Sequence, residues 1–266
     1  MGSFAEFPWT VLVPGYALLA LAMFIGWQRQ RRGGPVGSVD VLWTLGVGAL
    51  GMALAFAGEG LAARRWILAA LLAAWSLRLG LHLILRLRAE GEDGRYRDWK
   101  QQLGARSASV FFVFFQAQAL LAAVLALAFV PAAGNLAPLG SADFAAIALF
   151  ALAWFGEHRA DAQLAAFRAD PANKGKVCEA GLWRYSRHPN YFFETLHWFA
   201  YPLLAWNAPG GAWVWLAPIA MLLLVRFVTG VPPTEIRSLR SRGEAYRAYQ
   251  RSTNALIPGP RRTSTT

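Results

Sequence analysis

The residues best suited to chemistry gather in one short stretch, 181–193, which reads GLWRYSRHPNYFF. It combines basic, aromatic and amide side chains, and a strongly apolar segment follows at once. Polar groups at the start of a membrane helix are costly unless they meet a polar or charged partner. We therefore expect a polar ligand here. Its candidate contacts are Tyr185, Arg187, His188, Asn190 and Tyr191.

The segment before this stretch carries charges that suit phosphate. Asp161 and Arg168 are seven residues apart and would share one helix face, and Asp170 with the proline after it would end that helix. A flexible basic turn with Lys174 follows, and Arg and Lys on short loops bind phosphate groups. A Gly-rich nucleotide fingerprint is absent, so side chains would hold a nucleotide. Contact with anionic lipid head groups is the open alternative.

Further polar residues interrupt apolar segments: Asp40, Arg78, Gln116 and Glu194. Each has a structural interpretation, such as a helix cap, a snorkelling side chain or a bond to a neighbouring helix. Their common location near the same loops favours a polar cavity that opens to the cytoplasm.

Composition places the chain in a membrane. It is 56% hydrophobic and 15% charged, whereas soluble domains have about 25% charged residues. The net charge of +11 would suggest nucleic acid in a soluble protein, but the basic residues are confined to particular loops. The single cysteine and four histidines lack ligand spacing, so we expect no metal. We also expect no cleavable leader.

Apolar runs predict an all-α, polytopic protein with seven transmembrane helices in a single domain. With the N-terminus outside, the segments 28–37, 86–107, 157–190 and 232–266 are cytoplasmic and hold 22 of the 26 Lys and Arg. This alternation predicts an N-out, C-in topology. The predicted spans are 9–27, 38–57, 65–86, 108–130, 141–156, 191–208 and 212–231.

The tail after the last span predicts a basic amphipathic helix from Thr234 to about Gly243, followed by a second helical turn. Glu235 lies near its start, and Tyr246 lies beyond its end. A helix that simply rests on the membrane surface is the alternative.

Several segments together resemble a known family. They are DVLW at 40–43, WSLRLGLHLILR at 75–86, GEDGRYRDWK at 91–100, DAQLAAFRADPANKGKVCEAGLWRYSRHPNYFFE at 161–194 and GEAYRAYQRSTNALIP at 243–258. The chain is similar along nearly its whole length to the steroid 5α-reductase-like membrane enzymes, and most closely to their bacterial branch of seven-helix proteins. We therefore expect it in a bacterial inner membrane, with the cofactor site facing the cytoplasm.

The resemblance implies an NADPH-dependent reductase that transfers hydride to the carbon–carbon double bond of an α,β-unsaturated ketone in a steroid-like or other lipid. The cofactor contacts that it implies are Arg78, Asp161, Arg168, Tyr185, Asn190 and Glu194, with Lys174 and Arg187 near phosphates. We add the clustered residues His188, Glu235 and Tyr246.

Departures from the family concern the substrate side. Asp40 stands where the animal enzymes have a Gln-Glu-Leu-Pro motif, Trp75 stands in place of a tyrosine, and Phe193 replaces a glycine. We expect Trp43, Trp75 and Gln116 to contact the substrate. A donor must stabilise the enolate oxygen, and the candidates are Asp40, Tyr185 and Tyr191.

A membrane methyltransferase that uses S-adenosylmethionine is the alternative. Enzymes that methylate prenylated cysteine or phospholipid share a looser pattern, which RHPNY, Glu235, YRAY at 246–249 and IP at 257–258 satisfy. The basic residues around Lys174 favour a phosphorylated cofactor instead.

Overall fold

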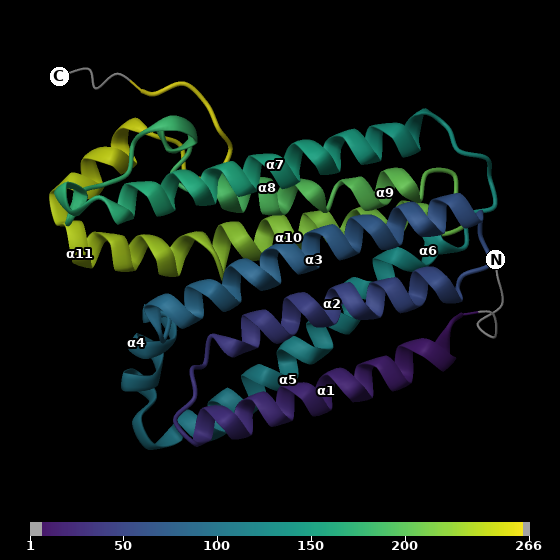
Figure 1. Ribbon diagram of the computed structural model, residues 1–266, viewed down its shortest axis with the longest axis horizontal. Helices are drawn as coiled ribbons and strands as arrows, with labels where there is room; N and C mark the ends of the chain where they lie inside the picture. Colours follow the sequence, from purple (N-terminus) through teal and green to yellow (C-terminus); the bar gives the residue numbers. More distant parts are fainter. Residues whose placement is uncertain (1–6, 263–266) are drawn as a thin grey trace. The chain divides into compact units, whose positions relative to one another are not determined.

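The computed structural model describes residues 7–262, and these residues are helical with no β-strand (Figure 1). A single isolated bridge joins Ser186 to Asn254. Five of the described helical segments are long and apolar enough to cross a membrane: Trp9–Arg31, Ser38–Ala57, Ala62–Ala89, Gly94–Ala133 and Gly211–Ser252. The fold therefore suits an integral membrane protein, while seven spans and their orientation stay predictions.

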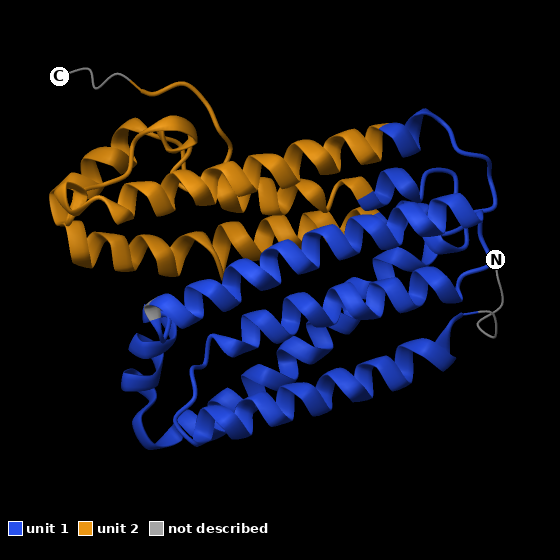
Figure 2. Ribbon diagram, in the orientation of Figure 1, with its two compact units in different colours: residues 1–144, 201–214 blue, residues 145–200, 215–266 orange. Residues whose placement is uncertain are grey.

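The chain forms two compact units, shown in different colours in Figure 2. Unit 1 comprises residues 1–144 and 201–214, and unit 2 comprises residues 145–200 and 215–266. The first boundary falls inside a helix, Ser141–Ala169, so no linker in the sequence marks it.

Unit 1 is built around helix α2 (Ser38–Ala57), which packs against its neighbours in the same unit. Small residues allow close approach: a Cβ at Gly48 would lie 2.3 Å from Ser76 Oγ, and one at Gly51 would lie 2.7 Å from the ring of Phe129. Such positions let helix backbones meet without lipid between them. The neighbours are α1 (Trp9–Arg31), α3 (Ala62–Glu90), α5 (Ser107–Ala126) and α6 (Val130–Ala133).

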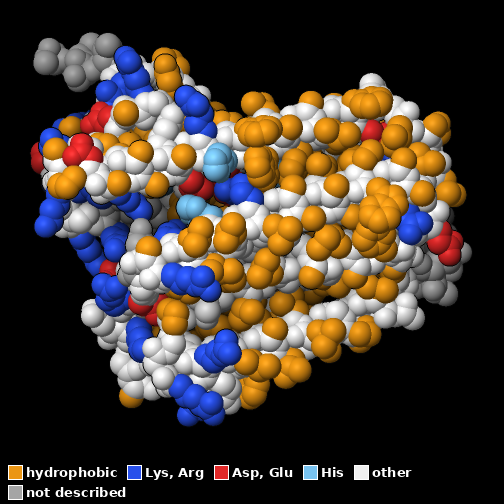
Figure 3. Space-filling model, viewed as in Figure 1, with side chains coloured by type: hydrophobic (Ala, Val, Ile, Leu, Met, Phe, Trp, Pro, Cys, Tyr) orange, Lys and Arg blue, Asp and Glu red, His pale blue; other side chains and the backbone are white. Residues whose placement is uncertain are grey.

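One end of unit 1 is basic. The short helix α4 (Gly94–Leu103) connects α3 to α5 there, and Asp93 caps it by accepting a hydrogen bond from Arg95 N–H at 2.9 Å. On the face in Figure 3, Lys and Arg gather around α4 and the adjoining end of α3, while hydrophobic side chains cover the helices beyond. This distribution matches helices whose middles contact lipid and whose end reaches water.

Unit 2 contains most of α7 (Ser141–Ala169), with α8 (Pro189–His197), α10 (Leu216–Phe227) and α11 (Val231–Ser252). Helix α8 packs on α10, and α10 packs on α11. The buried side chains of Val225, Val231 and Leu256 form a small core. The short helix α9 (Ala200–Leu204) leads back into unit 1.

The helix boundaries differ from the predicted spans in several places, and two of the differences involve proline. The span expected at 191–208 breaks between α8 and α9, because Pro202 lacks an N–H and its ring opposes the carbonyl of Trp198. The span at 212–231 ends at Phe227, and the two prolines at 232 and 233 begin α11 instead. Helix α7 ends at Ala169, as the sequence predicted. It runs without a break from the predicted span 141–156 through the polar segment that follows.

Candidate functional site

The stretch 181–193 is tied to the C-terminal segment of unit 2. Ser186 is buried, and its hydroxyl donates to the carbonyl of Leu256 at 2.7 Å. The backbone N–H of Arg187 donates to the carbonyl of Asn254 at 2.9 Å. The indole of Trp183 donates to the carbonyl of Ala160 on α7 at 3.0 Å. The stretch is therefore fixed on two sides.

Arg187 lies at the centre of these ties. Its guanidinium forms an ion pair with Glu235 at 2.6 Å and donates to the carbonyls of Gln250 and Thr253 at 3.1 and 2.5 Å. Gln250 also donates to Glu235 at 2.9 Å. Because these partners belong to the protein itself, the geometry gives Arg187 a positioning role beside the phosphate contact that the sequence predicted.

His188 and Tyr191 form a stacked pair, with ring centroids 5.4 Å apart. Burial lowers the pKa of His188 below its ordinary value, and the nearby charge of Arg187 acts in the same direction, against Glu235 at 3.3 Å. The Tyr191 hydroxyl lies 3.2 Å from Thr234 Oγ1 on α11. The two hydroxyls are thus placed to share a hydrogen bond, which either can donate.

Asn190 and Asp161, both predicted as cofactor contacts, lie close together. The Asn190 amide donates to the Asp161 carboxylate at 3.1 Å. Glu194 and His197 lie one turn further along α8, with 3.4 Å between carboxylate and ring. Tyr185 is 48% exposed, whereas Tyr246 is buried. Some predicted residues of unit 2 therefore pair with other side chains, whereas the side chain of Tyr185 is about half exposed.

Basic side chains crowd near the turn that follows α7. The guanidinium of Arg242 on α11 donates to the carbonyl of Lys176 at 2.9 Å. The positive charges of Arg168 and Arg237 are near enough to act on Arg242. Both Arg168 and Arg242 also act on the buried thiol of Cys178, whose pKa is raised by burial. Lys174 lies exposed in the same turn.

Unit 1 holds a second polar network, at its basic end. Asp40 accepts a hydrogen bond from the Tyr96 hydroxyl at 2.7 Å and pairs with Arg95 at 3.3 Å. Burial alone would raise the pKa of Asp93, but its bonds to Arg95, with the charge of Arg86, lower it to about 2. Asp40 thus accepts from the side chains of two residues of α4, which joins the start of α2 to that helix.

The residues predicted to contact substrate lie in the helices of unit 1. Trp43 and Trp75 pack edge to face with centroids 6.1 Å apart, and Trp75 is buried. The Gln116 amide donates to the carbonyl of Ala20 on α1 at 3.3 Å, which is the interhelical role that the sequence left open. Arg78, predicted as a cofactor contact, lies on α3 and so also belongs to unit 1.

Sequence reasoning missed several of these groups. Arg95 and Tyr96 stand in a polar loop helix where nothing marks them as partners of Asp40. Tyr249 was seen only as part of a motif, yet its hydroxyl donates to the carbonyls of Trp183 and Ser186 and so supports the stretch 181–193. Within the described residues, no three His, Cys, Asp or Glu side chains gather as metal ligands do.

The fold and its two polar networks define a helical protein suited to a membrane. A comparison with family profiles matches residues 26–253 to DUF1295, described as a protein of unknown function, and the chain belongs to this family. No curated protein and no solved structure matches the chain.

Proposed function

We propose that this protein is an NADPH-dependent membrane reductase that acts on the carbon–carbon double bond of an α,β-unsaturated ketone in a steroid-like or other lipid. The observation that carries the proposal is the positive charge at the turn of Lys174 and Lys176: Arg242 bonds to the carbonyl of Lys176, and the charges of Arg168 and Arg237 act on Arg242. The proposal includes seven spans, an N-out and C-in topology, and a site that faces the cytoplasm of a bacterium.

Crowded cations fit a polyanionic ligand. Like charges held close together repel one another, and Arg242 is half-buried, so water screens it less than at an open surface. A pyrophosphate or a ribose phosphate would relieve that repulsion through charge-assisted hydrogen bonds. The bond from Arg242 to the backbone of Lys176 holds the two sources of positive charge together. These donors suit the phosphates of NADPH.

Other residues of unit 2 would hold and orient the ligand. The bonds of Arg187 and Tyr249 fix the backbone of the stretch 181–193 before any ligand binds. Asn190 and Asp161 form a polar pair that can exchange hydrogen bonds with hydroxyl or amide groups. Preorganised contacts of this kind reduce the entropic cost of binding.

The reaction requires a proton donor. When bound, NADPH supplies hydride to the β carbon of the enone. A hydroxyl near the ketone then stabilises the charge that develops on its oxygen, and loss of one such donor slows the step by about 10²–10³-fold. Tyr191, beside Thr234, and the open hydroxyl of Tyr185 are the candidates in unit 2. Asp40 stays a candidate only if it takes up a proton.

One observation favours the methyltransferase alternative. The RHPNY segment is joined to Glu235 through Arg187, and Tyr249 of YRAY contacts the same stretch, which links the elements of the looser pattern. S-adenosylmethionine carries a carboxylate but no phosphate, so it matches the basic residues around Lys174 less well than the several phosphates of NADPH do. The cluster therefore supports the reductase.

Binding titrations on the purified protein test the proposal. We expect NADPH to bind more tightly than NADH, and S-adenosylmethionine to bind weakly or not at all. A lipid enone added with NADPH should cause loss of absorbance near 340 nm. Tighter binding of S-adenosylmethionine than of NADPH would overturn the reductase proposal.

A further inference from the structure

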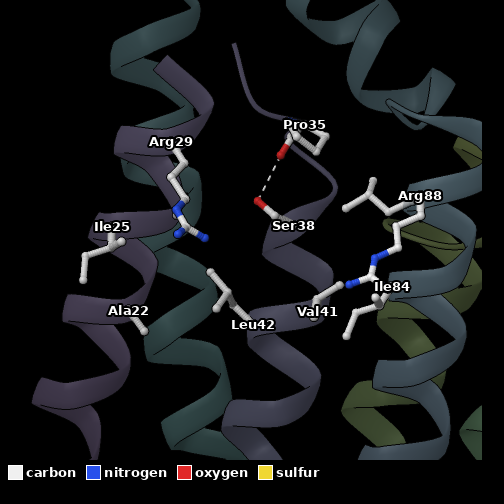
Figure 4. A pocket seen from close by; sticks show the side chains of 11 residues that line it. Ala22, Ile25, Arg29, Pro35, Ser38, Val41, Leu42, Ile84 and Arg88 are labelled. Carbon is white, nitrogen blue, oxygen red and sulfur yellow. Dashed lines mark hydrogen bonds between the residues drawn. The ribbon is translucent and has the colours of Figure 1, made fainter. Parts of the chain in front are cut away.

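A pocket of about 520 Å³ lies within unit 1, between the ends of α1, α2 and α3. Its size falls within the usual range for small-molecule sites, roughly 300–1,000 Å³. The close-up in Figure 4 shows side chains from all three helices directed toward the same space. The pocket belongs to neither polar network described above.

Most of the pocket lining is apolar. Ile25 of α1, Leu42 of α2 and Ile84 and Leu87 of α3 line it. Ile25 is 50% exposed, so the pocket opens at the side of the helices and not only at their ends. Neighbouring side chains on α3 that face outward, such as Leu85, are apolar and exposed. An opening flanked in this way faces the acyl chains of a bilayer.

Two arginines stand where the apolar lining ends. Arg29 and Arg88 both line the pocket, and Figure 4 shows their guanidinium groups turned into it from opposite helices. Among the residues that line the pocket in the described chain, none is acidic. Neither arginine takes part in the ion pairs that the structure describes at this end of unit 1.

Two carboxylates of the described side chains after α3, those of Glu92 and Asp93, have other partners. Glu92 accepts hydrogen bonds from the backbone N–H groups of Val36 and Gly37 at 2.7 and 3.2 Å. Asp93 pairs with Arg86 and Arg95. The positive charge of the pocket mouth is therefore left for a ligand.

We infer that this pocket binds one anionic membrane lipid, with its acyl chain against Ile25, Leu42 and Ile84 and its phosphate between Arg29 and Arg88. Charge complementarity identifies the occupant: two guanidinium groups at the end of an apolar pocket attract a lipid of net negative charge and repel the cationic group of a zwitterionic head. Basic pockets between membrane helices bind anionic head groups in this way. The site does not depend on the proposed reductase activity.

Native mass spectrometry on detergent-purified protein tests the inference, with phosphatidylglycerol and phosphatidylcholine of the same chain length. We expect one phosphatidylglycerol to be retained, and to bind at least tenfold more tightly than phosphatidylcholine. The double variant R29Q/R88Q should lose this preference. Ala22→Phe, which fills the pocket and keeps both arginines, should lower the retained lipid by a similar factor.

The control variant R31Q/R97Q removes two charges from the same end of unit 1 without touching the pocket lining. It should keep the preference for phosphatidylglycerol. Unchanged helix content and melting temperature show that each variant is folded. Equal loss in both double variants, equal binding of the two lipids, absence of bound phosphatidylglycerol, or competition by soluble glycerol phosphate would overturn the inference.

Discussion

Two groups of arginine side chains, one in each unit, show opposite ways of holding positive charge. In unit 1, Arg64 is 2% exposed and forms a two-pronged ion pair with Asp143 at 2.7 and 3.0 Å. Its remaining donors reach the carbonyls of Asn135, Ala137 and Pro138. All five N–H groups of the guanidinium are therefore used.

In unit 2, the positive charges of Arg168 and Arg237 both act on Arg242, which bonds to the backbone of the basic turn at Lys176. The contrast teaches that an arginine is not a functional signal by itself. An arginine matched by carboxylate and carbonyl oxygens holds connecting segments in place, whereas arginines that crowd one another are suited to an anion. Variants and ligands that act on each group of arginines test this contrast.

Arg64→Ala should destabilise the protein by about 3–5 kcal/mol, because it leaves Asp143 buried without its partner. The measurement is the free energy of unfolding in mixed micelles. The control is Arg65→Ala, whose side chain bonds only to the carbonyls of Ala55 and Phe56 and which should cost about 1 kcal/mol or less. Similar losses of unfolding free energy in both variants would contradict the structural role assigned to Arg64.

Arg187→Ala tests whether an arginine of unit 2 can also be structural. Loss of its ion pair and carbonyl contacts should cost about 2–3 kcal/mol, since a half-buried Glu235 loses a charged partner. Unfolding of this variant is compared with that of Arg184→Ala, whose side chain is exposed in the same stretch. If Arg187→Ala leaves the free energy of unfolding unchanged, Arg187 has no structural role and stays a predicted phosphate contact.

Inorganic pyrophosphate should stabilise the wild-type protein if the crowded arginines attract phosphate. With a dissociation constant of about 1 mM, roughly 10 mM ligand contributes about 1.4 kcal/mol. The readout is the thermal shift relative to sulfate at the same ionic strength. R168Q/R242Q should abolish the shift, and a shift that survives in this variant would place the anion elsewhere.

The smallest effect concerns His188, whose folded pKa lies below the unfolded value of about 6.5. The folded state then favours the neutral ring, so its contribution is complete above pH 6.5 and is lost as pH falls through the folded pKa. Between pH 7.5 and 5 the wild-type protein should lose stability more steeply than His188→Gln. If the stability of the two proteins falls equally with pH, protonation of His188 is not coupled to folding.

The helical architecture could be predicted from the sequence because apolar runs and charged loops are local signals. Helix α2 spans the predicted residues 38–57 without change, and α7 ends at Ala169, just before Asp170, as expected. Pairings between distant segments carry no such signal. The bond of Tyr96 to Asp40 joins residues 56 positions apart, and the division between units falls inside a helix. Such features require the packed structure.

The most direct test of the central claim compares NADPH binding by two double variants of matched charge. R168Q/R242Q removes crowded arginines, and R247Q/R251Q removes exposed arginines of α11 that pair with Glu244. We expect the first variant to weaken NADPH binding by about tenfold or more, with a smaller loss for NADH, and the second to change it by less than about twofold. Equal affinities in the two variants, or no NADPH binding by the wild-type protein, would contradict the claim that the arginine cluster of unit 2 holds a phosphorylated dinucleotide.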